Sequence, residues 1–375
     1  MLRYKCDKIL TETGIFNGYV YVQNEKIYAV TKEELPFRKE IDLRTFFLAP
    51  GFIDLHCHGG DGFEFIDATP EAFSRCCQIH YQHGTRILYP TFSASAFPIL
   101  KKALTIFAAE KDRQQMILPG AHLEGPYLSP QMCGAQDAGA VRAPVRQEYT
   151  ALVKQFGTLI KRWTYAPELD KSGAFIRFLT EHKIIASMGH SAATYAEVLP
   201  AFSAGCHLVT HLYSCTSTIT RQNGFRKLGI IEAAFLLKDM LVEAIGDGCH
   251  LPPELLKMIV QIKGYDHVCL VSDAIRFAGI KNCSGLTSSG NIPYLIEDGV
   301  AKLTDRSAFA GSIATADVLL KQAVQAGIEL NSAVNMLTAI PAKAMHLAEY
   351  GSITPGKRAV FTVFDKNFHT YSDLS

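Results

Sequence analysis

The sequence predicts an α/β protein whose main part is a (β/α)8 TIM barrel. Between residues 51 and 273, eight short apolar runs alternate with amphipathic stretches. This alternation is typical of parallel strands joined by helical crossovers, because such strands are buried on both faces. Eight units over about 250 residues match a (β/α)8 barrel. A doubly wound open sheet is the alternative that the same alternation allows.

The predicted barrel strands are apolar runs that end in polar or glycine-containing turns. They are Gly51–His56, Thr85–Thr91, Leu118–Glu124, Arg162–Glu168, Ile184–His190, Leu208–Tyr213, Leu241–Asp247 and Val268–Asp273. Apolar residues at helical spacing predict helices between many of them, at Pro70–His83, Phe97–Glu110, Lys171–His182 and Thr194–Ala204. After the eighth strand we expect a hairpin over Asn291–Leu303, with its turn near Asp298, and helices over Ala314–Ala326 and Asn331–Leu347.

Both ends of the chain are rich in β-type residues. Short strand-like runs separated by polar turns occur at Lys8–Thr11, Gly18–Val22 and Lys26–Val30, and again at Ala359–Asp365. Because chain termini often lie close together, the two ends are expected to form one small β domain. The expected division is therefore 1–49 and 349–375 for this β domain and 50–348 for the barrel.

Composition limits the functional classes. The 375 residues are 48% hydrophobic and 19% charged, with a formal net charge of +1, which is typical of a compact enzyme. Neither nucleic acid nor a membrane is an expected partner, because no basic field and no bilayer-length apolar run is present. The ten cysteines form no Cys-x-x-Cys motif and are interpreted as reduced, mostly buried thiols of a cytoplasmic protein, since the start of the sequence contains no signal-peptide pattern.

The segment Gly51–Gly60 contains the most informative motif. An apolar run ends in His56-Cys57-His58 and is followed by two glycines. Residues two apart on a strand point to the same side, so both imidazoles can aim at one point. Paired imidazoles at a strand end suit Zn²⁺ or Fe²⁺.

Other reactive side chains also follow the predicted strands. They are Glu124, His190, His211, Asp247, His250 and Asp273. In a (β/α)8 barrel the carboxyl ends of the strands open into one shared pocket, so these groups are expected to meet there. Burying so many imidazoles and carboxylates would be costly unless they shared a metal. His122 is expected to pack behind them. The remaining histidines, His80, His83, His182, His207, His267, His346 and His369, are interpreted as surface or capping residues.

Six motifs together resemble the amidohydrolase superfamily and, within it, the N-acetylglucosamine-6-phosphate deacetylase family. They are PGFIDLHCHGG, HLEGPY, GHS, THLY, DGCH and SDA, and the resemblance runs from Pro50 to about Asp365. It implies a (β/α)8 barrel with a small β-sandwich built from both chain ends. It also implies a metal-dependent hydrolase of linear amides that converts N-acetylglucosamine 6-phosphate to glucosamine 6-phosphate and acetate.

By position, the resemblance implies specific roles. Glu124, His190 and His211 match the main metal ligands, His56 and His58 match the pair that supports a second metal, and Asp273 matches the catalytic acid and base. The resemblance therefore implies one or two divalent ions, with Zn²⁺ the leading candidate and Fe²⁺ or Mn²⁺ as alternatives. The matching substrate-binding positions are Ala135, Gln136, Ser214, Cys215, Arg226, Asp247, His250, Phe309, Ala310 and Gly311. Arg226 lies in a loop that, in the family, reaches the phosphate across a homodimer interface.

Three segments depart from the family pattern. Gln136 replaces a histidine, Ser214-Cys215-Thr216 replaces Asn-Ala-Met, and Lys227 replaces a glutamate. A glutamine amide still donates a hydrogen bond but cannot carry a charge. The alternatives are therefore N-acetylgalactosamine 6-phosphate or another N-acyl or cyclic amide as the substrate. A non-catalytic barrel scaffold is the third hypothesis, and the complete set of ligand residues argues against it.

Overall fold

The computed structural model describes residues 1–289 and 292–374, and its centre is an eight-stranded parallel sheet. The strands follow the order β17-β16-β13-β12-β11-β10-β9-β6, so neighbours in sequence are neighbours in space. Their bounds are β6 (Phe52–Cys57), β9 (Thr85–Phe92), β10 (Ala121–Glu124), β11 (Ile160–Tyr165), β12 (Ile185–Met188), β13 (Leu208–Val209), β16 (Leu241–Ile245) and β17 (Val268–Val271).

The sheet closes into a barrel between its first and last strands. The Asp273 amide donates to the His56 carbonyl at 2.9 Å, and the His58 amide donates to the Ala274 carbonyl at 2.8 Å. These bonds join the edge strands β6 and β17, which excludes the open sheet and confirms the predicted (β/α)8 barrel.

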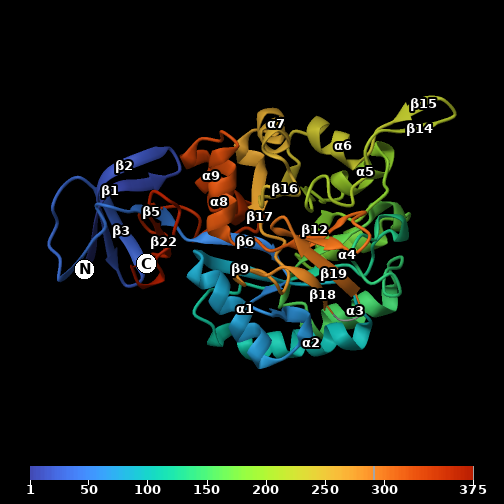
Figure 1. Cartoon of the computed structure of the whole chain (residues 1–375), viewed down its shortest axis with the longest axis horizontal. Helices are drawn as coiled ribbons and strands as arrows, with labels where there is room; N and C mark the ends of the chain where they lie inside the picture. The colour runs from blue at the N-terminus through green and yellow to red at the C-terminus, as the bar shows by residue number, and fades with distance from the viewer. Residues whose placement is uncertain (290–291, 375) are drawn as a thin grey trace.

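Helices cover the outside of the barrel (Figure 1). They are α1 (Pro70–Gln82), α2 (Phe97–Glu110), α3 (Arg146–Phe156), α4 (Ala174–Glu181), α5 (Tyr195–Ser203), α6 (Ile230–Leu236), α7 (Pro253–Lys263) and α8 (Ala316–Gln325). Helix α1 shows why they form: the Thr69 side chain accepts a hydrogen bond from the Ala72 amide, Pro70 occupies the first turn, and Phe73 and Cys77 are buried on the inner face.

The single helix predicted over Asn331–Leu347 is wrong, because the structure has two helices there. They are α9 (Leu330–Met336) and α10 (Ala339–Ala344). Pro341 has no amide proton and cannot continue the helical bond to the Leu337 carbonyl. That carbonyl instead accepts a hydrogen bond from the Ile53 amide at 2.8 Å, which ties the helical break to the start of β6.

The two chain ends form one six-stranded sheet, to the left of the barrel in Figure 1. The order is β22-β5-β1-β2-β3, with β4 beside β1. The strands are β1 (Leu2–Thr11), β2 (Gly14–Gln23), β3 (Lys26–Thr31), β4 (Lys39–Asp42), β5 (Phe47–Pro50) and β22 (Phe361–Phe364). Leu48 and Val363 pair across β5 and β22 and are buried, so apolar residues from both ends of the chain share one core.

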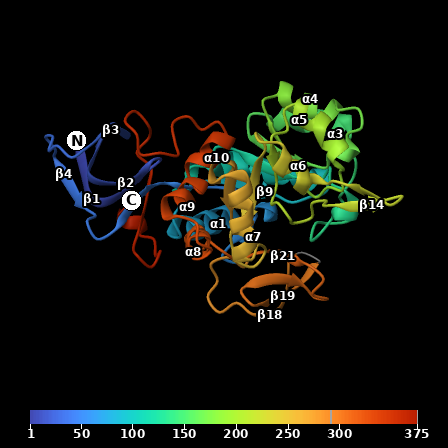
Figure 2. The ribbon, with the colours of Figure 1, turned by 90° about the horizontal axis from the view of Figure 1, so that it is seen from above.

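Three smaller β elements decorate the barrel. The pair β7 (Gly59–Gly60) and β8 (Phe63–Glu64) follows β6 directly. A four-stranded layer of β18 (Gly285–Ser289), β19 (Ile292–Glu297), β20 (Val300–Leu303) and β21 (Phe309–Ser312) lies along one side (Figure 2). It contains the predicted hairpin and its turn, although Asn291 lies outside the described residues. The hairpin of β14 (Thr220–Gln222) and β15 (Phe225–Lys227) projects from the body (Figure 1).

Within the part of the chain that the structure describes, no helix has the length and apolar character needed to cross a membrane.

Candidate active site

Glu124 is the centre of a cluster at the carboxyl ends of the barrel strands. It ends β10, and its Oε1 atom lies 2.8 Å from His211 Nε2 and 3.2 Å from His190 Nε2. His190 follows β12 and His211 follows β13. All three side chains are buried. Three strands thus bring one carboxylate and two imidazoles to one point, as the strand-end argument predicts.

The His-x-His pair completes the same cluster. His56 Nε2 and His58 Nε2 lie 3.2 Å apart, and Asp273 Oδ1 lies 3.3 Å from each of them. Glu124 bridges the two halves, since its Oε1 is 3.4 Å from His56 Nε2 and its Oε2 is 3.2 Å from His58 Nε2. The six side chains therefore form one continuous cluster of possible metal ligands.

The backbone turns sharply where the barrel presents these groups. His190, His211 and Asp273 have φ angles of 46°, 28° and 47°. Such left-handed conformations are uncommon for residues other than glycine and cost energy. They end the strands early and turn the three side chains into the mouth of the barrel, so the strain is concentrated where the chemistry is expected.

Charges within the cluster dominate the titration of its members. Burial alone would lower the pKa of His56, but the carboxylates of Glu124 and Asp273 outweigh it and raise the pKa to about 10. The pKa of His58 is likewise raised to about 9 against burial, chiefly by hydrogen bonds to Asp273 and Glu124. Burial would raise the pKa of Asp273, but His56 and His58 lower it to about 2. Two buried carboxylates thus demand compensating positive charge.

The donor set fits a divalent metal. Ligands on a tetrahedral ion with bonds of ~2.0–2.1 Å lie roughly 3.3 Å apart. The neighbouring nitrogen and oxygen atoms of the cluster that contact one another lie 2.8 to 3.4 Å apart. His56 Nε2 faces Glu124 and His211 in one group, and it faces His58 and Asp273 in another. Without a bridging ion, two imidazole nitrogens that face one another need a proton between them, because two lone pairs would repel. Imidazole and carboxylate ligands suit Zn²⁺, Fe²⁺ and Mn²⁺ alike.

Most of the imidazoles are also held at their second nitrogen. His58 Nδ1 lies 2.9 Å from Ser93 Oγ, and His190 Nδ1 lies 2.9 Å from the Met132 carbonyl. His56 Nδ1 lies 3.2 Å from Glu243 Oε2. His211 Nδ1 is buried and has no hydrogen-bond partner among the described residues. Partners at Nδ1 fix the ring so that Nε2 faces the cluster.

Gln136 contacts the cluster directly. Its Nε2 donates to Glu124 Oε2 at 2.6 Å, and its Oε1 accepts from the Ala94 amide at 2.8 Å. Gln136 therefore holds the central carboxylate in one orientation. Its second amide proton is left for a ligand in the cavity.

A cavity of about 810 Å³ opens in front of the cluster. Of the predicted site residues, those that line it are His58, Glu124, Ala135, Gln136, His190, His211, Ser214, Cys215, His250, Asp273, Phe309, Ala310 and Gly311. His56 is completely buried behind them. Asp247 lies outside the lining, but its Oδ2 is 2.7 Å from His250 Nδ1 and orients that ring.

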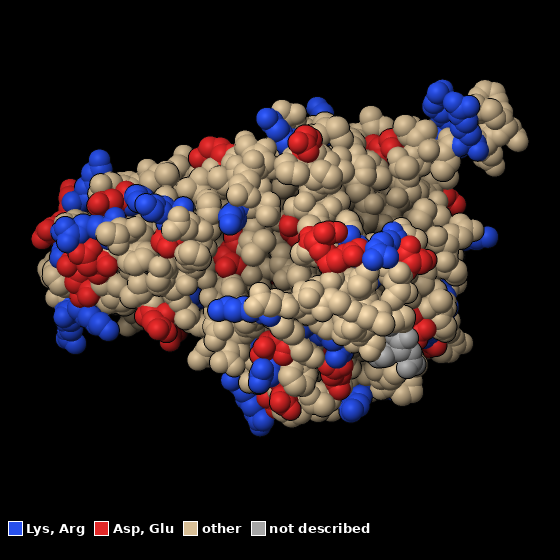
Figure 3. Space-filling view, in the orientation of Figure 1, with Lys and Arg blue, Asp and Glu red and all other residues tan. Residues whose placement is uncertain are grey.

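Arg226 is not part of the cavity of its own chain. It lies on β15 in the projecting hairpin, and its side chain is exposed. Lysine and arginine side chains of this hairpin stand clear of the body in Figure 3. Phe225, which precedes Arg226 on the same strand, is 75% exposed. A single chain therefore does not bring Arg226 to the other predicted residues.

One charged residue at the cavity wall, Arg276, was not among the residues predicted from the sequence. Arg276 lines the cavity and pairs with Glu64 Oε2 at 3.3 Å and with Asp67 Oδ1 at 3.1 Å, and both acids also line it. Arg276 follows Asp273 by three residues in the loop after the eighth strand. Its position in a loop at the carboxyl end of a barrel strand could have identified it as a residue of the cavity wall.

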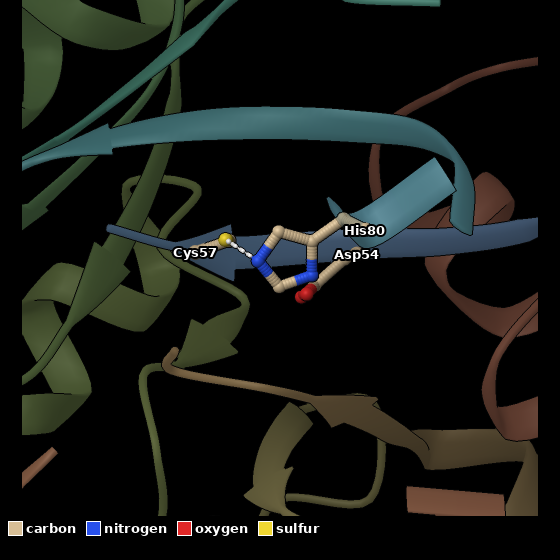
Figure 4. Close-up of side chains that lie close together, drawn as sticks. All are labelled: Asp54, Cys57 and His80. Carbon is tan, nitrogen blue, oxygen red and sulfur yellow. Dashed lines mark hydrogen bonds between the residues drawn. The ribbon is translucent and has the colours of Figure 1, made fainter. Parts of the chain in front are cut away.

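A second buried group of polar side chains lies near Cys57, on the side of β6 that faces α1 (Figure 4). Asp54, Cys57 and His80 offer ligand atoms within 4.8 Å of one another. Cys57 Sγ lies 3.1 Å from His80 Nε2, which also lies 2.9 Å from the Gly59 carbonyl. The interpretation of His80 as a surface or capping residue is therefore wrong, because the inner face of α1 buries it completely.

This second group is structural. The Asp54 carboxylate is already bonded to the Ser272 hydroxyl at 2.5 Å and to the His56 amide at 3.2 Å. Burial lowers the pKa of His80 to about 4 and raises that of the Cys57 thiol, so both are neutral. A buried neutral thiol that does not line the cavity is a poor nucleophile. His122 is buried too and bonds Thr91 and Thr164, in agreement with a place behind the ligands.

Comparison with known proteins adds three findings. Residues 47–375 match the amidohydrolase family. The chain is 33% identical to the N-acetylglucosamine-6-phosphate deacetylase of Bacillus subtilis, over 81% of this chain and 78% of the relative, and 29% identical to the N-acetylgalactosamine-6-phosphate deacetylase of Shewanella sp., over 85% and 79%. It resembles the structure of a mutant N-acetyl-D-glucosamine-6-phosphate deacetylase from Mycobacterium smegmatis in complex with N-acetyl-D-glucosamine-6-phosphate, with a TM-score of 0.90, 27% identity, and coverage of 98% and 96%.

Proposed function

The chain belongs to the amidohydrolase family and within it to the N-acetylglucosamine-6-phosphate deacetylases, and from this premise we propose its reaction. The enzyme hydrolyses the N-acetyl amide of an amino-sugar phosphate, with N-acetylglucosamine 6-phosphate as the main substrate and glucosamine 6-phosphate and acetate as products. The observation that carries the proposal is the convergence of Glu124, His56, His58, His190, His211 and Asp273 at the mouth of one cavity.

Glu124, His190 and His211 are proposed to hold the main metal, and His56 and His58 a second one. Zn²⁺ is the proposed ion. When bound, a divalent metal supplies the positive charge that polarises the amide carbonyl and lowers the pKa of water toward ~7. The same charge replaces the protons that the carboxylates otherwise hold on the imidazoles.

Asp273 moves the proton in the proposed mechanism. Neighbouring positive charge lowers the pKa of Asp273 against the effect of burial. The carboxylate is therefore ionised at neutral pH and can accept the proton of the attacking water. It then donates that proton to the amine nitrogen as the carbon–nitrogen bond breaks. An amide needs this second step, because an unprotonated amine anion is a very poor leaving group.

His250 and Gln136 are proposed to receive the oxygen atom that gains negative charge. Asp247 occupies His250 Nδ1, which leaves Nε2 as the ring atom for the substrate. Gln136 has one amide proton beyond the one that Glu124 accepts. Fixed donors of this kind stabilise the tetrahedral intermediate because they need not reorganise. Ala135, Ser214, Cys215 and the segment from Phe309 to Gly311 line the sugar.

A homodimer is proposed to complete the phosphate site. Arg276 is the only lysine or arginine among the described lining residues, and Glu64 and Asp67 already neutralise it. The exposed hairpin carries Arg226 and the apolar Phe225, a combination that suits insertion into a second copy. A planar guanidinium can give a phosphate two hydrogen bonds at once.

Two further assignments are proposals of the same kind. The division into residues 1–49 with 349–375 and residues 50–348 is supported by the pairing of β5 with β22. A cytoplasmic location is supported by ten free cysteines, because thiols remain reduced in that compartment.

The second candidate substrate is N-acetylgalactosamine 6-phosphate. Ser214 and Cys215 line the cavity where the family pattern has asparagine and alanine, and the Shewanella relative carries the galactosamine name. The deciding experiment is amine release from N-acetylglucosamine and N-acetylgalactosamine, each with and without the 6-phosphate. The metal-loaded Asp273→Asn variant is the control. No release from any of the four sugars by metal-loaded protein would overturn the proposal and favour the scaffold hypothesis.

A further inference from the structure

A buried ion pair lies directly behind the proposed metal ligands. Arg162 comes from β11 and Glu243 from β16, and both side chains are completely buried inside the barrel. The Arg162 guanidinium contacts Glu243 Oε1 and also donates to the Leu55 carbonyl at 3.2 Å. Its other donors reach Ser187 Oγ at 3.0 Å and Thr210 Oγ1 at 2.9 Å. One cation on β11 is therefore tied to β6, β12 and β16 and to the residue that directly follows β13.

The other oxygen of Glu243 reaches two of the proposed ligands. Oε2 lies 3.2 Å from His56 Nδ1, and it accepts a hydrogen bond from the backbone amide of His211 at 3.2 Å. A carboxylate only accepts hydrogen bonds, so His56 must carry its proton on Nδ1. Nε2 then faces the cluster, where His58 and Asp273 lie within 3.3 Å, and its lone pair would be the one offered to a metal there.

The pairing with Arg162 explains how this carboxylate can lie so close to the cluster. Glu124 and Asp273 already place two negative charges there. An unpaired third carboxylate would bind a cation of its own or would be neutralised, since burial of a lone charge is costly. Arg162 cancels the charge of Glu243 and leaves its oxygen as a hydrogen-bond acceptor. A buried ion pair of this kind adds little net stability, whereas it fixes one ring in one tautomer.

We propose that Glu243, neutralised by Arg162, is a positioning residue that keeps His56 in the Nδ1-protonated tautomer and so determines whether the His56–His58 half of the site binds its metal. The inference rests on the proposed metal-dependent function. It concerns metal affinity, so it can be tested without any substrate. The Glu124–His190–His211 half is expected to depend on Glu243 only through the backbone amide of His211.

The decisive variant is Glu243→Gln. Because Arg162 can only donate, it takes the amide oxygen of the new side chain. The amide NH2 then faces His56 Nδ1 and forces that atom to accept, which places the ring proton on Nε2. Loss of a partner behind a metal ligand typically weakens metal binding by 10–100-fold. We expect the affinity for the second Zn²⁺ to fall by about that factor, and the affinity for the first to change much less.

The measurement is Zn²⁺ stoichiometry and affinity by chelator competition, with elemental analysis of the dialysed protein. The matched control is Asp317→Asn, which makes the same change beside His83 Nδ1, at 2.8 Å, away from the cavity lining. It should retain both metals. In a His56→Asn background, Glu243→Gln should change the affinity for the remaining metal only slightly, through the lost acceptor of the His211 amide.

Three results would overturn the proposal: both affinities unchanged in Glu243→Gln, both reduced equally in a natively folded protein, or an equal loss in the Asp317→Asn control. If Glu243→Gln does not fold, Glu243→Asp retains the charge for Arg162 while withdrawing the oxygen from His56. It should still weaken the second metal selectively, and unchanged binding in a folded Glu243→Asp protein would also refute the inference. A failure of deacetylation alone would leave this result untouched.

Discussion

The loss of Arg226 tests the least expected feature of the site, which is that one chain lacks a free cation for the phosphate among its described lining residues. Arg226 lies on the exposed hairpin strand β15, and Arg276 in the cavity is bound to two acids. Arg226→Ala removes the guanidinium without disturbing a buried contact. Folding and metal content should therefore stay as in the wild-type protein.

The size of the effect follows from one lost charge-assisted hydrogen bond. We expect KM for the phosphorylated sugar to rise roughly ten- to a hundredfold, with kcat little changed. KM for the unphosphorylated sugar should stay the same. Lys227→Ala is the matched control, because adjacent strand residues point to opposite faces and its loss tests a general effect of charge. Equal KM increases for both sugars would show that Arg226 does not recognise phosphate.

Mixing two impaired variants, assayed at a substrate concentration well below the raised KM of Arg226→Ala, decides whether the arginine comes from a partner. Arg226→Ala and Asp273→Asn each damage a different part of a composite site. In a mixed dimer the chain with intact Asp273 receives Arg226 from the other chain. After free subunit exchange, roughly a quarter of all sites should be intact, since half of the dimers are mixed and each has one good site. No recovery in a mixture proven to contain mixed dimers would refute the cross-subunit arrangement.

Three further changes have defined outcomes. Asp273→Asn should keep its metal but lower kcat by about 10²–10⁴-fold, and near-wild-type turnover would remove Asp273 from the mechanism. Glu124→Gln should lose metal and activity together, whereas His56→Asn should lose at most one metal, and elemental analysis distinguishes the two. In metal-free protein, the charges that raise the pKa of His56 to about 10 and of His58 to about 9 stabilise the fold fully below pH ~6.5. That contribution is lost as pH rises through 9 to 10, so Tm should fall there without metal and fall less with it, and parallel curves would contradict the assignment.

The barrel was predictable because its strands are buried on both faces and leave continuous apolar runs in the sequence. The residues at which these strands end could not be predicted in the same way. The run over Leu208–Tyr213 reads as one strand, yet β13 ends at Val209 because His211 adopts a left-handed backbone conformation. The run to Asp273 likewise ends as β17 at Val271. Apolar pattern reports burial and not backbone angle, so it extends through the residues at which the catalytic groups leave the sheet.

Of the site residues, the sequence predicted mainly those that directly follow a predicted strand. Arg162 and Glu243 belong to predicted strands, where a charged residue only interrupts the apolar run and indicates no function. Two opposite charges within otherwise buried strands were the available signal, because a buried ion is expected to have a partner. Which strands place them together depends on barrel closure, which the chain order alone does not give. The exposure of Arg226 could not be predicted either, since a loop motif does not show whether its side chains reach the site of the same chain or that of a second copy.

At Gln136, where the resemblance to the family implies a histidine, an amide takes part in holding a proposed metal ligand, Glu124. Its amide joins the Ala94 backbone to Glu124, so it holds the central carboxylate in one orientation. A neutral imidazole also has one donor and one acceptor, but they lie on opposite sides of a rigid ring, whereas an amide presents both at one end of a flexible side chain. One amide proton at this position is therefore already used in the hydrogen bond to Glu124, and only the other can reach a substrate. His250, whose ring Asp247 orients, is therefore the donor that we propose as the main one for the acyl oxygen.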